Sequence, residues 1–303
     1  MHAQVVAAIA AFEPVTLVVD PAHAADARRR VTADNVEIVD IPIDDSWLRD
    51  SGPIITVGPD GERAGIDFRF NAWGEAFTPY DKDAAVAKLI LEHLKIERFA
   101  SPIVLEGGSI AVDGEGTLVT TEQCLLNRNR NPLLDQPEIE QELSLQLGID
   151  RFVWLGRGLV EDADTDGHVD NVAAFLEPRR VLLQTVSNED DPNYANAQEN
   201  RRRLGEAGLR VVEFDLLPRI RRGAGQASGA GEHVAIPYMN FYLCNGAAIV
   251  PLAEIDRDMD EEALRRLRGS MPGREVVGVP GRVLALGGGG VHCITQQVPE
   301  AAA

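Results

Sequence analysis

Cysteine, aromatic and basic residues are all scarce in this chain. Its 303 residues include only 3 cysteines, which cannot all pair with one another and share no spacing typical of a zinc site. That usage fits a reducing compartment and predicts a cytoplasmic protein. Lys and Arg number 29 against 48 Asp and Glu, a formal net charge of −19, which argues against a basic surface for nucleic acid or anionic membrane. The same charge favours a cationic substrate.

Long hydrophobic runs are also missing. Nothing reaches the roughly 18 apolar residues of a membrane span, and residues 1–12 carry no basic region followed by a cleavage site. What is present, 45% hydrophobic residues, is enough for a large core. No linker composition divides the chain, so we expect a single domain over residues 1–303. The Gly- and Ala-rich stretch 221–231 is predicted to be a surface loop or a mobile lid.

Helical periodicity and paired strand-like runs alternate along the chain. Helices are predicted at 82–99, 138–147, 195–208 and 259–268. Hairpins are predicted where two strand-like runs flank turn residues, at 109–121, 172–186 and 240–252. The order of a polar or Gly-rich corner, a hairpin, a helix and another strand recurs without sequence identity. We therefore expect an α/β fold of structural repeats whose corners meet at a common axis.

One cysteine follows a run of residues without side chains near the end of the chain. Four glycines, 287–290, precede Val291, His292 and Cys293. Glycines let the backbone bend and a substrate come close, and a reachable thiolate is a good nucleophile. The alternative is a glycine turn before a buried core cysteine, and this segment alone does not separate the two.

Three other corners concentrate charge. Residues 44–53 hold three carboxylates together with Arg49 and Trp47. Trp47 is suited to stack on a flat cation, and Asp50 is suited to accept hydrogen bonds from that cation. The alternative is a surface turn in which Arg49 pairs with a neighbouring acid. Glu106 and two glycines follow an apolar strand, which puts this carboxylate at the strand's mouth.

His168 and Asp170 are two residues apart, which on a strand points both side chains to one side. With Glu106 they also make a candidate metal site, but only one of the three is an imidazole, and the other five histidines have no partner spacing. We therefore favour a site without metal. Cys124 and Cys244 are interpreted as packing residues.

Taken together, the corners resemble the agmatine deiminase family, relatives of the bacterial peptidylarginine deiminases in the guanidine-modifying superfamily. The resemblance spans about residues 7–299. It is carried by the motifs WLRDSGP at 47–53, EGGSI at 106–110 with DGEGT at 113–117, CLLNRNRNP at 124–132, DTDGHVDN at 164–171 and HCITQQ at 292–297.

The resemblance implies a fivefold pseudo-symmetric α/β propeller (pentein) that acts as a hydrolase. By it Cys293 is the nucleophile, His168 the general acid and base, Glu106 its orienting partner, and Asp50 and Asp170 the guanidinium clamp. Trp47 and Asp164 would bind substrate as well, Asp164 through its distal amine. The implied reaction converts agmatine to N-carbamoylputrescine and ammonia, a step of putrescine and polyamine biosynthesis. No metal or organic cofactor is required, and the family habit is a homodimer.

Two departures from the family pattern carry expectations. The chain starts after a segment that belongs to the family's first repeat, so we expect that repeat to be shortened. Gly290 stands where relatives commonly carry asparagine, so we expect a polar contact beside the nucleophile to be lost. The alternatives left open are a deiminase of free or peptidyl arginine, a non-catalytic or truncated guanidine-binding homologue, and a metal-dependent hydrolase.

Overall fold

The computed structural model describes residues 1–221 and 233–300, and the fold is α/β. Four three-stranded sheets repeat one connection: an antiparallel hairpin, a crossover containing a helix, and a third strand parallel to the second. A parallel pair needs such a crossover, because its strands start at the same edge. The strands are β3 (Ile54–Val57), β4 (Arg63–Arg69), β5 (Glu97–Val104), β6 (Ile110–Val112), β7 (Thr117–Thr121), β8 (Arg151–Leu155), β9 (Ala173–Glu177), β10 (Arg180–Gln184), β11 (Arg210–Phe214), β14 (Tyr242–Cys244), β15 (Ala247–Leu252) and β16 (Glu275–Pro280).

A smaller unit, counted here as the first of five in chain order, opens the chain. Its strands β1 (Val15–Val19) and β2 (Val36–Asp40) are parallel and joined through α2 (Ala24–Arg30), and among the described residues they have no antiparallel partner. A separate antiparallel ribbon pairs β12 (Arg219–Arg221) with β13 (His233–Ala235). The predicted loop or lid at 221–231 lies, apart from Arg221, outside the described residues.

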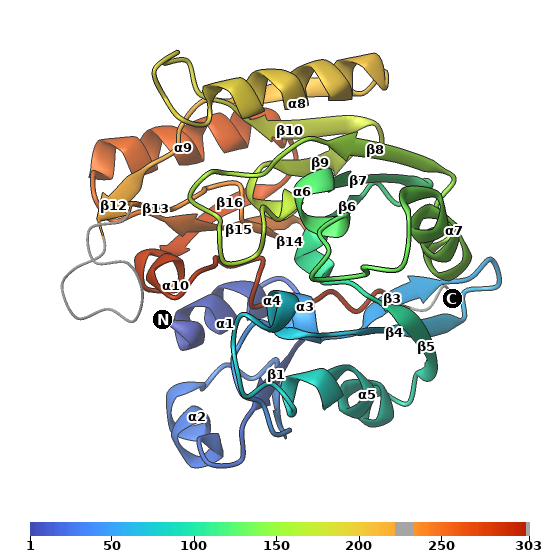
Figure 1. The fold of residues 1–303 in the computed structure, drawn as a ribbon. Helices are drawn as coiled ribbons and strands as arrows, with labels where there is room; N and C mark the ends of the chain where they lie inside the picture. Colours follow the sequence, from blue (N-terminus) through green and yellow to red (C-terminus); the bar gives the residue numbers. More distant parts are fainter. Residues whose placement is uncertain (222–232, 301–303) are drawn as a thin grey trace.

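The long helices lie around the outside of the molecule and the strands inside them (Figure 1). The crossover helices are α5 (Asp83–Leu94), α7 (Gln136–Leu147), α8 (Tyr194–Glu206) and α9 (Arg257–Ser270); α1 (His2–Ala10) precedes the first unit. The remaining helical segments are short: α3 (Leu48–Ser51), α4 (Ala72–Glu75), η1 (Gly107–Ser109), α6 (Glu122–Leu125), η2 (Val169–Asn171) and α10 (Arg282–Leu286). None of the described helices has the length and apolar character that crossing a membrane requires.

The sequence predicted these elements well, with one wrong helix end. The three predicted hairpins are β6–β7, β9–β10 and β14–β15. Helix α7 begins at a capping box formed by Asp135 and Glu138 and ends at Gly148 in the left-handed conformation. The prediction of helix up to residue 99 is wrong, because Lys95 turns left-handed (φ 55°) and the chain from Glu97 pairs as β5.

Hydrophobic clusters join the units in a cyclic order. The first unit packs on the second through Ile41, Val86 and Ile90, and the second packs on the third through Ile66, Leu118 and Leu143. The third unit packs on the fourth through Val119, Leu155 and Leu183, and the fourth packs on the fifth through Leu182, Phe214 and Val250. The fifth unit packs back on the start of the chain through Ile249, Val5 and Ile9. The turns at the inner ends of the strands are thereby brought together.

Candidate active site

The first inner turn holds a buried carboxylate between two donors. Asp50 lies in α3, where its Oδ2 accepts the indole N–H of Trp73 at 3.0 Å and its Oδ1 accepts the backbone N–H of Gly108 at 2.9 Å. Burial raises the pKa of Asp50 to about 6, with the neighbouring acids Asp170 and Glu106 adding to the shift against the opposing effect of His168.

Trp73 reaches Asp50 from a strained turn that the sequence analysis missed. Residues 72–75 all have positive φ, at 50°, 56°, 84° and 62°, and the side chain of Asn71 accepts the N–H of Gly74. Only Gly74 is a glycine, and each other residue costs roughly 1–2 kcal/mol in this conformation. This strained turn places the indole N–H donor of Trp73 against the carboxylate of Asp50.

The second turn follows β5, as expected for a carboxylate at a strand's mouth. Glu106 is fully buried, and its Oε1 accepts the Nε–H of Arg130 at 2.6 Å. Its Oε2 has no hydrogen-bond partner and lies 3.9 Å from Nε2 of His168. Glu106 therefore faces the imidazole that it is predicted to orient, at a distance longer than a hydrogen bond.

His168 and Asp170 face the same point, but not for the predicted reason. The interpretation as a strand is wrong, because the segment is the turn η2 and the backbone N–H of His168 donates to Asp162 and Thr165. Burial works to lower the pKa of His168, yet the negative charge of Asp50, with Cys124 and Glu106, raises it well above the usual value. His168 is thus favoured as an imidazolium.

Gly108 marks the centre where these groups converge. A β-carbon at Gly108 would lie 2.6 Å from Nδ1 of His168, 2.9 Å from Oδ1 of Asp50 and 3.1 Å from Oδ2 of Asp170. Real β-carbons essentially never approach so closely, so the glycine is what leaves this space open. The space is walled by two carboxylates and one imidazole.

The nucleophile candidate adjoins this space. The Sγ of Cys293 lies 3.5 Å from Oδ2 of Asp170 and 3.2 Å from Nδ2 of Asn240, and 7% of the residue is exposed. Burial, followed by the charges of Asp170 and Asp50, raises the pKa of Cys293 well above its usual value. Before any cation arrives, the group is a thiol rather than a thiolate.

The glycine run before Cys293 permits two close contacts. A β-carbon at Gly289 would lie 2.4 Å from the indole of Trp47, and one at Gly290 would lie 2.3 Å from Oδ1 of Asn240. Trp47 therefore packs on the run, and its predicted stacking on a cation stays a prediction. Asn240 fills the place next to Gly290 and contacts Cys293, so a polar contact to the nucleophile is present; the expected loss of a contact from position 290 itself stays a prediction.

Sequence reasoning missed Asn240 and His292. Asn240 is fully buried and bridges Asn171 to Cys293, while its Oδ1 accepts the backbone N–H of His292 at 3.0 Å. The His292 ring contacts Oδ2 of Asp170 through Nδ1 at 2.8 Å. Burial works to raise the pKa of Asp170, but this hydrogen bond together with the nearby charges of His292, His168 and Arg49 lowers the pKa overall. The place of His292 next to the cysteine was the one available signal.

Arg49 serves a different purpose from the surface pairing that was considered. It is buried, and its Nη1 donates to the side chains of Gln296 and Gln297 at 2.6 Å each. Its backbone N–H also donates to the carbonyl of Cys293 at 3.0 Å. These bonds join the first turn to the last motif, more than 240 residues away.

Asp164 lies beside the glycine run and lines a small cavity together with it. A β-carbon at Gly288 would lie 3.4 Å from Oδ2 of Asp164. The cavity lining combines acids, the glycine run and apolar residues; it includes Glu161, Asp162, Asp164, Asn171, Gly288 and Gly289. An acidic wall of this kind suits a cationic group.

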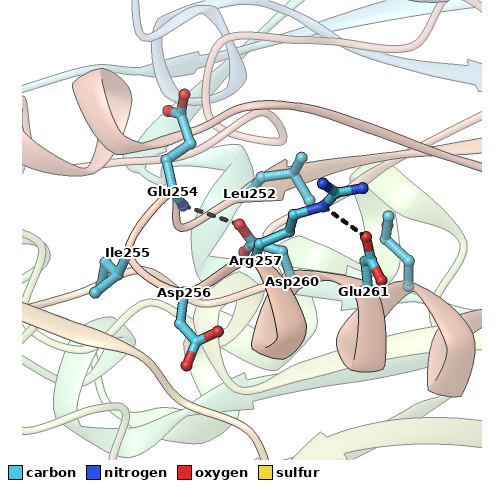
Figure 2. A pocket seen from close by; sticks show the side chains of 8 residues that line it. Leu252, Glu254, Ile255, Asp256, Arg257, Asp260 and Glu261 are labelled. Carbon is cyan, nitrogen blue, oxygen red and sulfur yellow. Dashed lines mark hydrogen bonds and ion pairs between the residues drawn. The ribbon is translucent and has the colours of Figure 1, made fainter.

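A second hollow, at the start of α9, holds none of these groups (Figure 2). Its charged side chains are used within the fold: Arg257 donates to Glu261 at 2.8 Å, and Asp260 accepts the backbone N–H groups of Ala253 and Glu254. These contacts fix the chain entering α9, and the described residues that line this hollow include no cysteine or histidine.

One cluster of metal-binding side chain types occurs among the described residues, and it differs from the predicted one. The candidate ligand atoms of Glu106, Cys124 and His168 lie within 4.8 Å of one another, whereas Asp170 is not part of the cluster. Cys124 is fully buried, as a packing residue would be, and it also lies in this cluster; its interpretation as a packing residue stays a prediction. Cys244 is buried in an apolar cluster, as expected.

Known proteins resemble this chain over nearly its whole length. The sequence profile of the Porphyromonas-type peptidyl-arginine deiminase family matches residues 1–299. An agmatine deiminase of Ectopseudomonas mendocina is 43% identical over 314 residues, covering 96% of this chain and 84% of its own. Among solved structures, agmatine deiminase of Enterococcus faecalis superposes with a TM-score of 0.93 at 33% identity, covering 99% of this chain and 87% of that one. A cysteine-to-serine variant of the C. jejuni agmatine deiminase, solved with substrate bound, gives 0.88 at 30% identity, with 97% and 85% covered.

Proposed function

The chain belongs to the Porphyromonas-type peptidyl-arginine deiminase family, and we propose that it hydrolyses agmatine to N-carbamoylputrescine and ammonia. One observation carries the proposal. A thiol, an imidazole and two carboxylates surround a buried space that only a glycine leaves open. A step of this kind belongs to the formation of putrescine and other polyamines.

The space fits a guanidinium by charge and by hydrogen bonding. The group is planar and cationic, and its N–H bonds pair with carboxylates. Asp50 and Asp170 supply two buried carboxylates on either side of Gly108, and Oδ1 of Asp170 is buried without a hydrogen-bond partner. A guanidinium would satisfy that oxygen and neutralise the acids together.

Substrate binding would also ionise the nucleophile. The acids that raise the pKa of Cys293 are the ones a guanidinium neutralises. One charge pair at ~4 Å and an effective dielectric of ~20 is worth about 4 kcal/mol, or roughly 3 pKa units. The thiol therefore loses its proton to solvent when the cation docks, and the reactive thiolate forms only beside its target.

The chemistry then proceeds through a covalent intermediate. The thiolate of Cys293 adds to the guanidinium carbon, the His168 imidazolium gives its proton to one nitrogen, and ammonia leaves an amidino-thioether. A water molecule attacks this carbon and gives its proton to the neutral imidazole. Collapse breaks the C–S bond while the remaining hydroxyl proton passes to solvent, which releases the neutral ureido product and the thiolate. Glu106 holds the imidazole, once their 3.9 Å gap has closed.

The distal end of the substrate separates agmatine from arginine. Agmatine ends in a primary amine, and the acid Asp164, beside Asp162 and Glu161, lines the adjoining cavity. Free arginine carries a carboxylate that this wall would repel. Agmatine is therefore the substrate we propose over free or peptidyl arginine, and Trp47, which packs on Gly289 of the same cavity, is proposed to contact it as well.

We further propose that the units form a fivefold propeller within a single domain. The cyclic order of the hydrophobic clusters and the convergence of the inner turns support this arrangement. The two-stranded first unit is consistent with a shortened first repeat. Homodimer assembly and a cytoplasmic location stay predictions from the sequence and the family resemblance.

The test measures ammonia and ureido product from agmatine, free arginine and a blocked arginine peptide. We expect turnover of agmatine, its abolition in Cys293→Ala, and its retention in the matched thiol control Cys244→Ala. Asp170→Asn should raise KM and lower kcat together. Near-normal turnover by Cys293→Ala would overturn the mechanism, and a folded chain that binds agmatine without turnover would favour the non-catalytic alternative. Loss of turnover with a chelator would favour the metal-dependent hydrolase.

A further inference from the structure

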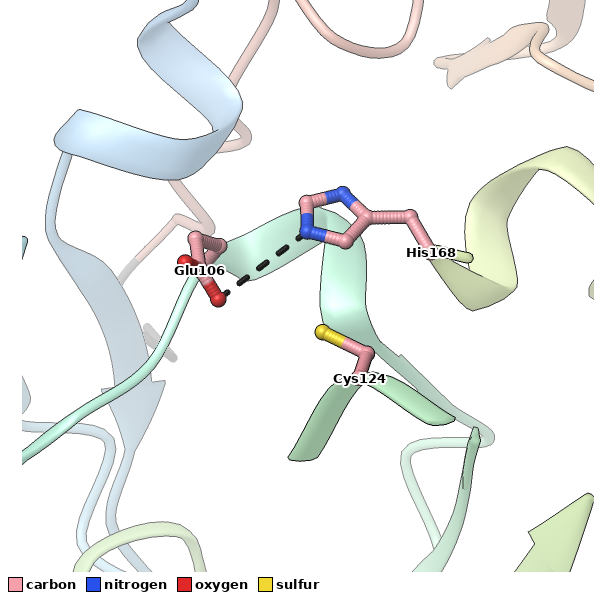
Figure 3. Close-up of side chains that lie close together, drawn as sticks. All are labelled: Glu106, Cys124 and His168. Carbon is pink, nitrogen blue, oxygen red and sulfur yellow. Dashed lines mark ion pairs between the residues drawn. The ribbon is translucent and has the colours of Figure 1, made fainter. Parts of the chain in front are cut away.

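Three buried side chains beside the proposed guanidinium space face one another without completing their hydrogen bonds. Oε2 of Glu106 and Nε2 of His168 both lack a partner, although 0% and 1% of these residues are exposed. The sulfur of Cys124 lies with them, and all three atoms fall within 4.8 Å of one another. Figure 3 shows the three side chains pointing into one region from separate segments. Unpaired buried polar atoms are costly, so their shared orientation calls for an occupant.

Each of the three is fixed from behind. Oε1 of Glu106 is held by Arg130 at 2.6 Å, which turns Oε2 toward the cluster. Cys124 lies in α6, where its backbone N–H donates to the hydroxyl of Thr121. The backbone of His168 is held by Asp162 at 3.1 Å. Ligands braced in this way need little rearrangement to bind an ion.

The donor set identifies the class of ion. One sulfur, one imidazole nitrogen and one carboxylate oxygen suit zinc and similar thiophilic divalent ions, whereas magnesium and calcium prefer oxygen alone. Atoms bound to a tetrahedral zinc at about 2.0–2.3 Å lie roughly 3.3–3.6 Å apart. The observed separation of 3.9 Å between Oε2 of Glu106 and Nε2 of His168 is only slightly wider.

Charge balance points the same way. To bind, the divalent ion must displace the proton of the His168 imidazolium and that of the Cys124 thiol; the ion, the thiolate and the carboxylate of Glu106 then add up to no net charge, which a buried site tolerates. The fourth tetrahedral position would take a water molecule. Cys293 lies outside the cluster, so this site differs from a metal held by the nucleophile.

We propose that Glu106, Cys124 and His168 form a binding site for a thiophilic divalent cation that inhibits turnover. The bound ion is coordinated by Nε2 of His168 and Oε2 of Glu106. While it is bound, His168 cannot transfer protons and Glu106 cannot orient the imidazole. The inhibition rests on the proposed function; the binding does not.

Cobalt(II) tests the binding directly, because a thiolate–cobalt bond gives a charge-transfer absorption that needs no turnover. We expect this band in the wild-type protein, in Cys293→Ala and in Cys244→Ala, and its loss in Cys124→Ala. Cys124→Ser, which keeps the side-chain shape, serves as a second variant, and circular dichroism checks the fold of each. Competition with zinc should show affinity weakened more than about 100-fold in both Cys124 variants, beyond the roughly 10- to 100-fold scale seen when only a supporting residue is lost.

Activity provides a separate readout. Zinc should inhibit agmatine turnover by the wild type and by Cys244→Ala, and a chelator should reverse this inhibition. For Cys124→Ser, the zinc concentration that halves its own metal-free rate should be at least about tenfold higher. A band lost in Cys293→Ala but kept in the Cys124 variants would overturn the proposal, as would no band in the wild type. If metal-free protein does not turn agmatine over, the proposed function fails while the cobalt result still decides the site.

Discussion

The contact between Asn240 and the nucleophile makes the sharpest prediction. Nδ2 of Asn240 lies 3.2 Å from the sulfur of Cys293, and the hydrogen bond acts to lower the thiol pKa. Asn240→Ala removes the donor. A hydrogen bond to a charged group contributes about 1.5–3 kcal/mol, which corresponds to about 1–2 pKa units. At a fixed pH below the thiol pKa, the thiolate fraction should therefore fall roughly 10- to 100-fold.

The assay is the rate of Cys293 alkylation by iodoacetamide, followed by mass spectrometry across a pH series in a Cys244→Ala background. We expect the curve for Asn240→Ala to shift to higher pH by about 1–2 units. Asn240→Asp should shift it in the same direction, since it keeps the acceptor for the N–H of His292 but replaces the donor with a negative charge. This second variant separates the effect on the thiol from loss of the backbone contact.

Gly290 provides the coupling test. A β-carbon there would lie 2.3 Å from Oδ1 of Asn240, so Gly290→Ala must push the amide away. The variant should reproduce the alkylation shift of Asn240→Ala, and the double variant should show no further shift, because the amide is already gone. Unchanged alkylation in Asn240→Ala, or additive shifts in the double variant, would refute the reasoning.

Three further predictions concern the carboxylates. Gly108→Ala places a methyl group within about 3 Å of His168, Asp50 and Asp170, so agmatine turnover should be lost; crowding of this kind costs about 1–3 kcal/mol, so the urea midpoint, measured alongside, should fall while the protein still folds. Burial raises the pKa of Asp50 to about 6, so its carboxylate takes up a proton as the pH falls below that value. The value of kcat/KM for agmatine should then drop up to tenfold per pH unit. A flat kcat/KM profile from pH 7 to 5 would contradict this role of Asp50. Trp73→Phe removes the indole donor that favours the charged carboxylate, so the same acid limb should move upward by about one unit; an unmoved limb would show that Trp73 only packs.

Local signals in the sequence determined the elements and the reacting residues. Turn residues between strand-like runs placed three hairpins, and the carboxylate after an apolar strand placed Glu106 at the inner end of β5. The glycine run pointed to Cys293 because a run without side chains is visible in the chain itself. The error at the end of α5 arose where helical periodicity passes directly into strand-like sequence.

Contacts between distant segments were decided only by the tertiary structure. Asn240 lies 53 residues from Cys293, Cys124 reaches His168 from another unit, and His292 contacts Asp170 across 122 residues. Such pairs leave no mark in local spacing, because they depend on how the units pack and which inner turns then face one another. The sequence alone therefore determined which chemical groups the chain carries and on which turns. The packing decided which of them touch, how far burial shifts the pKa values, and where a glycine leaves room for substrate.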